Sequence, residues 1–247
     1  FGLNKTQLLM NSGTAVDEIK LIHFNDCVSR RCNHEPLQYI IGMWDFHKFS
    51  FKVGEGVLIP RPETEILVDF AVEKIQKHNY TVVFVLCCGS GCIGLSIAKL
   101  CSSVKVYCAD ISDKALEYTR QNKELLGVDN VTVIKTDILE STGFFGLPRP
   151  DIVISNPPYI RTSDIKDLQE EVSFEPQLAL DGGEDGLMFY RALSEIWYPF
   201  INRGGYLAME CGEDQAEDIV SLFVNKADKG RVIKDTAGHN RVVVIAR

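Results

Sequence analysis

The chain has no uninterrupted apolar run of the roughly 18 residues that a membrane-spanning helix needs, and it does not begin with the basic and then hydrophobic stretch of a signal peptide. It also has no CxxC pair and no histidine spacing of the zinc-site type, although it contains 8 cysteines. Most of these cysteines fall within apolar segments, which is typical of buried thiols in a reducing compartment. We therefore expect a soluble intracellular protein that holds no metal.

The chain has fewer basic than acidic residues. The chain has 26 Lys and Arg residues against 34 Asp and Glu residues, and its formal net charge is −8. Proteins that bind a phosphate backbone need clustered cations, because much of their affinity comes from counterion release. This composition disfavours nucleic acid as a partner, and we expect a monomer that acts without nucleic acid and without a membrane.

The length and composition suit one large domain with a small appendage, since 45% of the 247 residues are hydrophobic. Residues 1–35 have a helical pattern that Pro36 ends. Residues 36–61 alternate aromatic and aliphatic side chains between glycines, which is typical of a hairpin. We therefore divide the chain into an N-terminal helical segment (1–35), a hairpin linker (36–61) and a main domain (62–247).

The main domain alternates between helical and strand periodicity. Its strands read as continuous apolar runs, as expected for a parallel sheet that is buried on both faces. This alternation predicts a doubly wound α/β sheet. The expected helices are 63–78, 92–101, 112–127, 186–201 and 213–227, and the expected strands are 81–87, 104–110, 131–137, 151–155, 204–211, 231–235 and 241–247.

The turn after the first strand of this domain reads LCCGSGCIG. Gly89 and Gly91 allow the backbone to approach a ligand closely, and the following helix presents its N-terminal amides to it. Ligands of open parallel sheets bind at this edge. A Gly-x-Gly turn also occurs as plain packing, so the turn alone leaves both interpretations open.

Polar residues end three further strands. Asp110 closes the second strand, where a carboxylate can accept from both hydroxyls of a ribose. Asp137 closes the third strand, within reach of an adenine amino group, and Asn156 closes the fourth. Because the strands are otherwise apolar, these residues favour a nucleoside-containing ligand.

The segment Asn156-Pro157-Pro158-Tyr159 directly follows the fourth strand. Its two prolines stiffen the loop and remove two backbone donors, which leaves a loop rich in acceptors. The Asn156 side-chain oxygen and the Pro157 carbonyl can accept the two protons of a substrate NH₂ group, while the Tyr159 ring packs against its planar group. An amide or aromatic amine held in this way in front of a sulfonium methyl group is activated mainly by orientation. It needs no strong base before attack, because its proton becomes acidic only after methylation.

The chain resembles one family of S-adenosylmethionine-dependent methyltransferases, the HemK/PrmC family. The resemblance is carried, in order, by IPRPETEIL, GSGCIGLSIA, SNPPYI, FEPQLALDGGEDGL and AGHNRVVVI, and RRCNHEPLQYIIG is similar to the start of that family's linker. It implies a class I methyltransferase fold, Rossmann-like with a seven-stranded, mostly parallel sheet. It also implies N5-methylation of the glutamine in the Gly-Gly-Gln motif of class I peptide chain release factors, in the bacterial cytoplasm or a mitochondrion.

The resemblance also implies roles for particular residues. Arg61 and Thr64 would lie over the cofactor, although a salt bridge from Arg61 to a loop carboxylate is an equally good interpretation. Glu175, Pro176 and the 181–183 turn would shape the substrate opening, unless they only order a loop. The implied cofactor-binding residues are Cys87, Cys88, Gly89, Ser90, Gly91, Asp110, Asp137, Ile138, Asn156, Arg61 and Thr64. The implied catalytic and substrate-binding residues are Asn156, Pro157, Pro158 and Tyr159, with Glu175 added for substrate binding.

Two positions depart from the family pattern, which usually has an acid where Val85 stands and glycine where Cys87 stands. Losing both is expected to weaken cofactor binding by about 1–3 kcal/mol, the scale of lost charged hydrogen bonds. The family's leading helical domain is also longer than residues 1–35, so we expect part of the release-factor docking surface to be absent.

Two other functions remain open at this stage. NPPY alone is shared with enzymes that methylate exocyclic amines of adenine, so a DNA or RNA adenine or guanine methyltransferase is one alternative, which the acidic composition opposes. The other is a degenerate cofactor-fold module without turnover, motivated by Val85 and Cys87.

Overall fold

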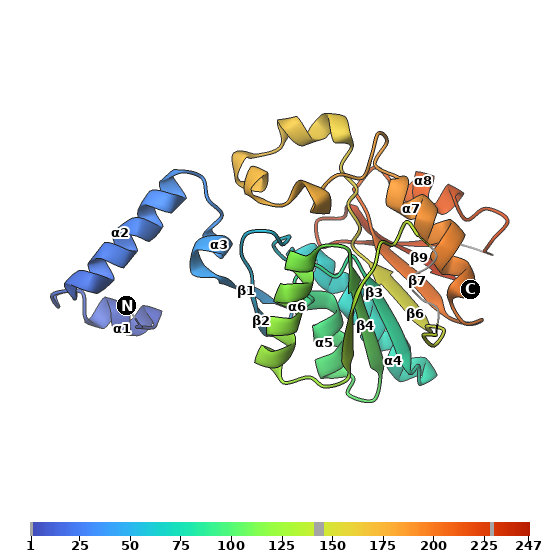
Figure 1. Ribbon diagram of the computed structural model, residues 1–247, viewed down its shortest axis with the longest axis horizontal. Helices are drawn as coiled ribbons and strands as arrows, with labels where there is room; N and C mark the ends of the chain where they lie inside the picture. Colours follow the sequence, from blue (N-terminus) through green and yellow to red (C-terminus); the bar gives the residue numbers. More distant parts are fainter. Residues whose placement is uncertain (1, 141–145, 228–229) are drawn as a thin grey trace.

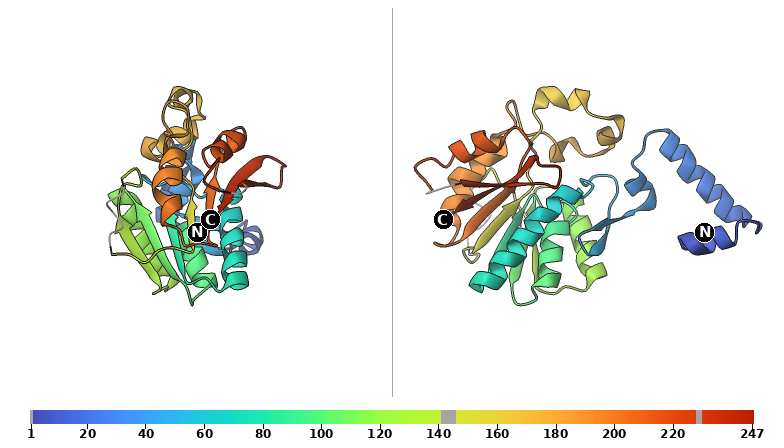
Figure 2. Two further views of the ribbon diagram at one scale, coloured as in Figure 1. Left: turned by 90° about the vertical axis from the view of Figure 1, so that its right-hand side faces the viewer. Right: turned by 180° about the vertical axis from the view of Figure 1, so that it is seen from behind.

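The computed structural model describes residues 2–140, 146–227 and 230–247, and these residues form a seven-stranded sheet covered by helices on both faces (Figures 1 and 2). The strand order is β5-β4-β3-β6-β7-β9-β8; β9 runs antiparallel to both of its neighbours, and the other pairs are parallel. This confirms the expected doubly wound, mostly parallel sheet. The strands are β3 (Val82–Leu86), β4 (Lys105–Asp110), β5 (Val131–Lys135), β6 (Ile152–Ser155), β7 (Tyr206–Glu210), β8 (Gly230–Lys234) and β9 (Asn240–Ala246).

The two faces of the sheet have separate hydrophobic cores because successive strand residues point to opposite sides. In β3, Val83 and Val85 pack with helices α4 (Glu65–His78), α5 (Cys92–Leu100) and α6 (Asp113–Leu126). Phe84 and Leu86 pack on the other face with α7 (Met188–Ala192) and α8 (Ala216–Ser221). Burial on both faces explains why these strands read as continuous apolar runs in the sequence.

The crevice of the sheet lies where the strand order reverses. The chain leaves β3 for β4 and β5 on one side and then returns to place β6 on the other side of β3. In the β3–β6 register, Leu86 lies opposite Ser155. The turn that follows Leu86 and the loop that follows Ser155 therefore emerge side by side, at the position where sheets of this kind bind ligands.

The N-terminal region extends away from this body as α1 (Lys5–Met10) and α2 (Glu18–Cys32) (Figure 1). Both helices begin at side-chain caps, Asn4 and Asp17, which accept from backbone amides of the first turn. Helical structure in residues 2–35 agrees with the sequence pattern, and residue 1 lies outside the described residues.

The glycine spacing predicts a hairpin from residue 36, but a helix comes first. α3 (Leu37–Ile41) begins at Pro36, whose carbonyl accepts from the amides of Tyr39 and Ile40. A proline can begin a helix as readily as it ends one, because the first helical amides need no partner within the helix. The hairpin itself is β1 (Met43–Phe46) with β2 (Phe49–Lys52).

Two predicted helices are shorter or less regular than expected. The pattern at 186–201 becomes α7 (Met188–Ala192), a π-helical turn and a 3₁₀ turn that contains Pro199. Proline lacks an amide proton, and so a regular α-helix cannot continue through that turn. The pattern at 213–227 becomes α8 (Ala216–Ser221) followed by turns.

Candidate cofactor and substrate site

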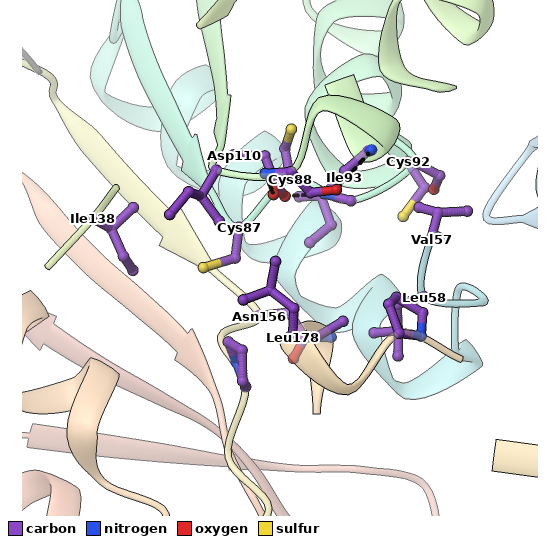
Figure 3. A pocket seen from close by; sticks show the side chains of 18 of the residues that line it. Val57, Leu58, Cys87, Cys88, Cys92, Ile93, Asp110, Ile138, Asn156 and Leu178 are labelled. Atoms are coloured by element: carbon purple, nitrogen blue, oxygen red, sulfur yellow. Dashed lines mark hydrogen bonds between the residues drawn. The ribbon is translucent and has the colours of Figure 1, made fainter. Parts of the chain in front are cut away.

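A cleft of about 900 Å³ opens at the carboxyl edge of β3, β4, β5 and β6 (Figure 3). It brings together residues that are far apart in the sequence, since Asp110, Ile138 and Asn156 follow or end different strands. The predicted cofactor residues that line it are Arg61, Thr64, Cys87, Cys88, Gly89, Ser90, Asp110, Asp137, Ile138 and Asn156.

The β3–α5 turn forms one wall of this cleft. Gly89 adopts a left-handed φ of +55°, and a Cβ there would meet only Val57, at 3.8 Å. The Gly89 carbonyl accepts from the Thr119 hydroxyl at 2.9 Å, which holds the turn against α6. Gly91 is not among the lining residues. It precedes α5 with a left-handed φ of +82°, and a Cβ on it would lie 2.9 Å from both Leu95 and Thr119, so backbone conformation and packing both favour glycine there.

Asp110 lines the cleft at the end of β4, where the sequence predicts the ribose. Its Oδ2 accepts from the Gly89 amide and its Oδ1 from the Ser112 amide, both at 2.9 Å. Burial raises the pKa of this carboxyl, while the backbone amides of Ser112 and Gly89 oppose the rise. Each oxygen keeps a second lone pair, so the fixed carboxylate fits the paired hydroxyls of a ribose.

Asp137 and Ile138, which the sequence predicts beside the adenine, give the cleft one polar and one apolar lining residue. Asp137 uses Oδ1 to accept from the Leu139 amide at 2.9 Å, which fixes the carboxylate at the end of β5. Ile138 is buried, and its carbonyl accepts from Trp197 Nε1 at 3.0 Å. With Phe189 and Leu178 also lining the cleft, these residues fit a planar, apolar ring that carries an amino group.

A second cavity of about 530 Å³ adjoins the first. Leu58, Arg61, Asn156 and Ala179 line both cavities, so Asn156 lies where they meet. The Asn156 amide nitrogen donates to Thr64 Oγ1 at 3.3 Å, which leaves the side-chain oxygen to accept from a ligand. The second cavity is lined by Leu58, Arg61, Asn156, Pro157, Tyr159, Ile160, Leu168, Val172, Ala179, Leu180 and Glu210.

The 181–183 turn supports the NPPY loop from behind. The Ile160 amide donates to the Leu180 carbonyl at 3.0 Å, and the Gly182 amide donates back to the Ile160 carbonyl at 2.8 Å. A Cβ on Gly182 would lie 2.8 Å from Tyr159 Cα and 2.9 Å from the Pro158 carbonyl oxygen. The loop is therefore held by hydrogen bonds and by close packing as well as by its prolines.

Glu175 lines neither cavity. Its buried carboxylate accepts from the Ile59 amide at 2.9 Å and forms an ion pair with Arg61. Arg61 therefore makes the salt bridge to a loop carboxylate that the sequence left open, and it also lines both cavities. Glu175 acts on the site by joining the linker to the loop above the sheet edge.

The two residues that depart from the family pattern, Val85 and Cys87, lie in different surroundings. Val85 is fully buried in the core beneath α5 and is not among the lining residues of either cavity. Cys87 lines the cofactor cleft and has a left-handed φ of 53°, a conformation that favours glycine. Burial raises the pKa of its thiol, which is therefore neutral.

Glu210 is a charged residue at the site that the sequence interpretation missed. It ends β7, is 1% exposed, and lines the second cavity. Burial raises the pKa of its carboxyl to about 7. The available signal was an acid at the end of the apolar strand YLAME, the same signal that identified Asp110.

The described residues contain neither a metal-binding cluster nor a membrane-spanning helix. Within residues 2–140, 146–227 and 230–247, no group of three His, Cys, Asp or Glu side chains is arranged to hold a metal ion. None of the helices in this part of the chain has both the length and the apolarity to cross a membrane.

Comparisons with known proteins agree with this geometry. A family profile described as "Methyltransferase small domain" matches residues 64–181, and one described as "PrmC N-terminal domain" matches residues 1–42. A 16S rRNA methyltransferase of T. thermophilus, solved with AdoMet and guanosine, has the same fold, with a TM-score of 0.58, 14% identity and coverage of 83% of this chain and 49% of that one. An O-methyltransferase family protein from Burkholderia thailandensis has a TM-score of 0.51 at 13% identity, covering 75% and 56%.

Curated relatives are much closer in sequence. The release factor glutamine methyltransferase of Clostridium acetobutylicum is 40% identical over 243 residues, which are 97% of this chain and 85% of that protein. The enzyme of the same name from Thermodesulfovibrio yellowstonii is 38% identical, over 89% of this chain and 79% of that protein. Identity at this level over nearly the whole chain shows that the chain belongs to the family of release factor glutamine methyltransferases.

Proposed function

We propose that this chain transfers a methyl group to the side-chain nitrogen N5 of the glutamine in the Gly-Gly-Gln motif of a class I peptide chain release factor. S-Adenosylmethionine is the cofactor of this methyltransferase. The observation that carries the proposal is the meeting of two cavities at Asn156, one lined by most of the predicted cofactor residues and by Pro158, and the other lined by Asn156, Pro157 and Tyr159. A small substrate group in the second cavity would meet the first cavity where Leu58, Arg61, Asn156 and Ala179 line both.

The hydrogen-bond acceptors and the apolar wall of the cofactor cleft fit S-adenosylmethionine. Asp110 offers two fixed carboxylate oxygens to the ribose, and Asp137 and Ile138 offer an acceptor and an apolar wall to the adenine. When bound, the cofactor supplies a methyl group on a positively charged sulfur. Thr64 and Arg61 close the cleft from the linker side, where their side chains help to exclude water.

The NPPY loop orients the nucleophile. A primary amide is a poor nucleophile because its nitrogen lone pair is delocalised, so catalysis depends on holding the nitrogen in line with the methyl group. The Asn156 side-chain oxygen and the Pro157 carbonyl accept its two N–H bonds, and Tyr159 packs against the amide plane. Burial raises the pKa of Tyr159 to about 12, so its ring carries a neutral phenol throughout the physiological range.

Mass spectrometry of a release factor incubated with the enzyme and S-adenosylmethionine tests the proposal. We expect a mass increase of one methyl group, located on the Gly-Gly-Gln glutamine. A release factor with Gln→Asn at that position is the matched control and should stay unmodified. Absence of methylation in the wild-type factor, or methylation of adenine in an added oligonucleotide instead, contradicts the proposal.

We also propose a monomeric enzyme that needs neither nucleic acid nor a membrane and acts in the bacterial cytoplasm or a mitochondrion. Its net charge of −8 supports the absence of a nucleic acid partner. The division into segments 1–35, 36–61 and 62–247 belongs to the same proposal, with the first segment as part of a release-factor docking surface. Sedimentation of the enzyme alone and with its release factor tests the stoichiometry.

Asp110→Ala should weaken S-adenosylmethionine binding by about 10- to 100-fold, because it removes a charged acceptor from the ribose and releases the Gly89 amide. Isothermal titration measures the dissociation constant directly. Asp113→Ala is the matched control, since Asp113 is exposed and pairs only with Lys135 at the surface. An unchanged dissociation constant for Asp110→Ala contradicts the ribose contact.

A further inference from the structure

Glu210 and Asn156 occupy equivalent places on neighbouring strands. β6 and β7 are parallel, and their last paired residues are Ser155 and Met209. Asn156 and Glu210 each follow one member of that pair, and strands in a sheet lie about 4.8 Å apart. Both residues line the second cavity, so the Glu210 carboxyl lies beside the residue that we assign to the substrate amide.

The Glu210 carboxyl has the Thr64 hydroxyl as a hydrogen-bond partner, but no cation among the described residues forms an ion pair with it. Its Oε2 is buried and has no hydrogen-bond partner among the described residues. The nearby arginines are paired with other acids, Arg241 with Asp235 at 3.1 Å and Arg61 with Glu175. An unpaired buried carboxyl costs folding free energy, and titratable groups placed this way in clefts are candidates for chemistry.

The proposed reaction needs a group that accepts a proton from the substrate nitrogen. When the amide nitrogen has formed its bond to the methyl carbon, the carbon–sulfur bond has broken and its electron pair stays on sulfur as a neutral thioether. The positive charge is then on the methylated amide, whose N–H proton has become strongly acidic. The proton must leave before the product is a neutral N-methyl amide, and a carboxylate that lines the same cavity is placed to accept it.

We propose that the Glu210 carboxylate accepts this proton from the substrate nitrogen. The carboxylate becomes a neutral carboxylic acid, the amide becomes neutral, and the proton passes to solvent after the product leaves. This inference rests on the proposed function and adds a residue to it. The orientation by Asn156 and Pro157 is unchanged, and Glu210 acts only as the nitrogen loses its proton.

The groups around Glu210 set the pH range in which its carboxyl gains and loses its proton. Burial raises its pKa to about 7, while the Thr64 hydroxyl and the charges of Arg241 and Arg61 oppose the rise and Glu63 adds to it. The groups that face it from the packed elements are Thr64, Glu63 and Arg61 before α4, Cys92 of α5, Tyr159 of the NPPY loop, Tyr190 of α7, Cys211 after β7 and Arg241 of β9. The accepting, ionised form of Glu210 is therefore the main form only above about pH 7.

Glu210→Gln is the central test, because glutamine keeps the shape and removes the proton acceptor. With wild-type enzyme and saturating S-adenosylmethionine, the single-turnover rate of glutamine methylation should rise with pH through about 7. In Glu210→Gln the rate should fall by about 10²-fold or more and lose this pH dependence, which is the usual scale of general base catalysis. The dissociation constant of S-adenosylmethionine should stay within about twofold, because Glu210 does not line the cofactor cleft.

Two variants outside the assigned machinery should shift the pH profile in opposite directions. Glu63→Gln removes a like charge and should move the midpoint to lower pH, whereas Arg241→Gln removes an opposite charge and should move it to higher pH. A purely structural role for Glu210 does not predict such shifts. A reduced rate in Glu210→Gln with the wild-type pH profile overturns proton acceptance, and so does an unchanged rate.

A substrate-free measurement separates this inference from the proposed function. A carboxyl whose pKa is raised from 4.5 to about 7 by folding binds more protons in the native than in the unfolded state, so its contribution to stability falls as pH rises through that range. The Tm of Glu210→Gln minus that of wild type should therefore increase between about pH 4.5 and pH 7. A difference independent of pH overturns the inference, whereas failure of wild-type enzyme to methylate glutamine overturns the proposed function instead.

Discussion

Asn156→Ala should reduce the turnover of glutamine methylation by at least about 10³-fold while the protein stays folded. The residue lies where the cofactor cleft meets the second cavity, and its side-chain oxygen is the acceptor that we assign to the substrate amide. Loss of one oriented polar contact in an active site costs about 10²- to 10³-fold. Loss of orientation for a weak nucleophile adds to this, since small misplacements reduce rates by about 10²-fold.

The hydrogen bond from Asn156 to Thr64 makes a second variant informative. Asn156→Asp keeps an acceptor oxygen but loses the amide that donates to Thr64 Oγ1, and it places a negative charge beside Glu210. We expect it to lose most activity as well, because the orientation of the acceptor depends on that donor. The two variants together separate the presence of an acceptor from its positioning.

Asn202→Ala is the matched control for these variants. Asn202 lies at the opposite edge of the sheet, where its amide donates to Asp151 Oδ1 at 2.8 Å. Its loss should lower the free energy of unfolding by about 1 kcal/mol and leave turnover nearly unchanged. Rapid quench measurement of a single turnover gives the rate, and Asn156→Ala with a wild-type rate would refute the role of Asn156.

The sheet could be predicted because its sequence signals are local. Each buried parallel strand is a continuous apolar run, and Ser112 and Gly127 mark the ends of α6. The helices in the second half of the main domain are less predictable. Helix geometry near Pro199 depends on packing against the sheet, and periodicity does not report packing.

The meeting of Asp110, Asp137 and Asn156 in one cleft was predictable for a different reason. In a parallel sheet, polar residues that end successive strands arrive at one edge, so Asp110, Asp137 and Asn156 could be assigned to one site from their positions alone. The interaction of Arg61 with Glu175 spans more than 100 residues of chain and joins a linker to a loop. Such a pair is set by tertiary packing, and the sequence shows only that both charges are present.

Glu210 shows the limit of the strand-end argument. It has the same sequence signal as Asp110, but β7 lies beyond β6 from the cofactor turn, and the sheet order is needed to place it beside Asn156. Gly91 shows why a Gly-x-Gly turn left two interpretations open, because its left-handed φ of +82° and its close neighbours Leu95 and Thr119 call for glycine without any ligand.

Gly182→Ala should reduce turnover by about 10²-fold although Gly182 lines neither cavity. The added Cβ would lie 2.8 Å from Tyr159 Cα and 2.9 Å from the Pro158 carbonyl oxygen, and both of these are backbone atoms that cannot move aside as a flexible side chain can. The NPPY loop must therefore shift away from the turn. Overpacking of this kind costs about 1–3 kcal/mol of stability, and the shift also moves the acceptors that hold the amide.

Comparing turnover with S-adenosylmethionine binding distinguishes displacement of the NPPY loop from general destabilisation. The cofactor cleft is held mainly by the β3–α5 turn and the ends of β4 and β5, so S-adenosylmethionine should bind Gly182→Ala within a few-fold of wild type. Gly13→Ala is the control for stability and for S-adenosylmethionine binding, because a Cβ at Gly13 meets nothing within 4 Å and its backbone is not left-handed. If Gly182→Ala retains full turnover at a temperature where it is folded, the NPPY loop tolerates displacement, and rigid positioning cannot be the source of its catalytic effect.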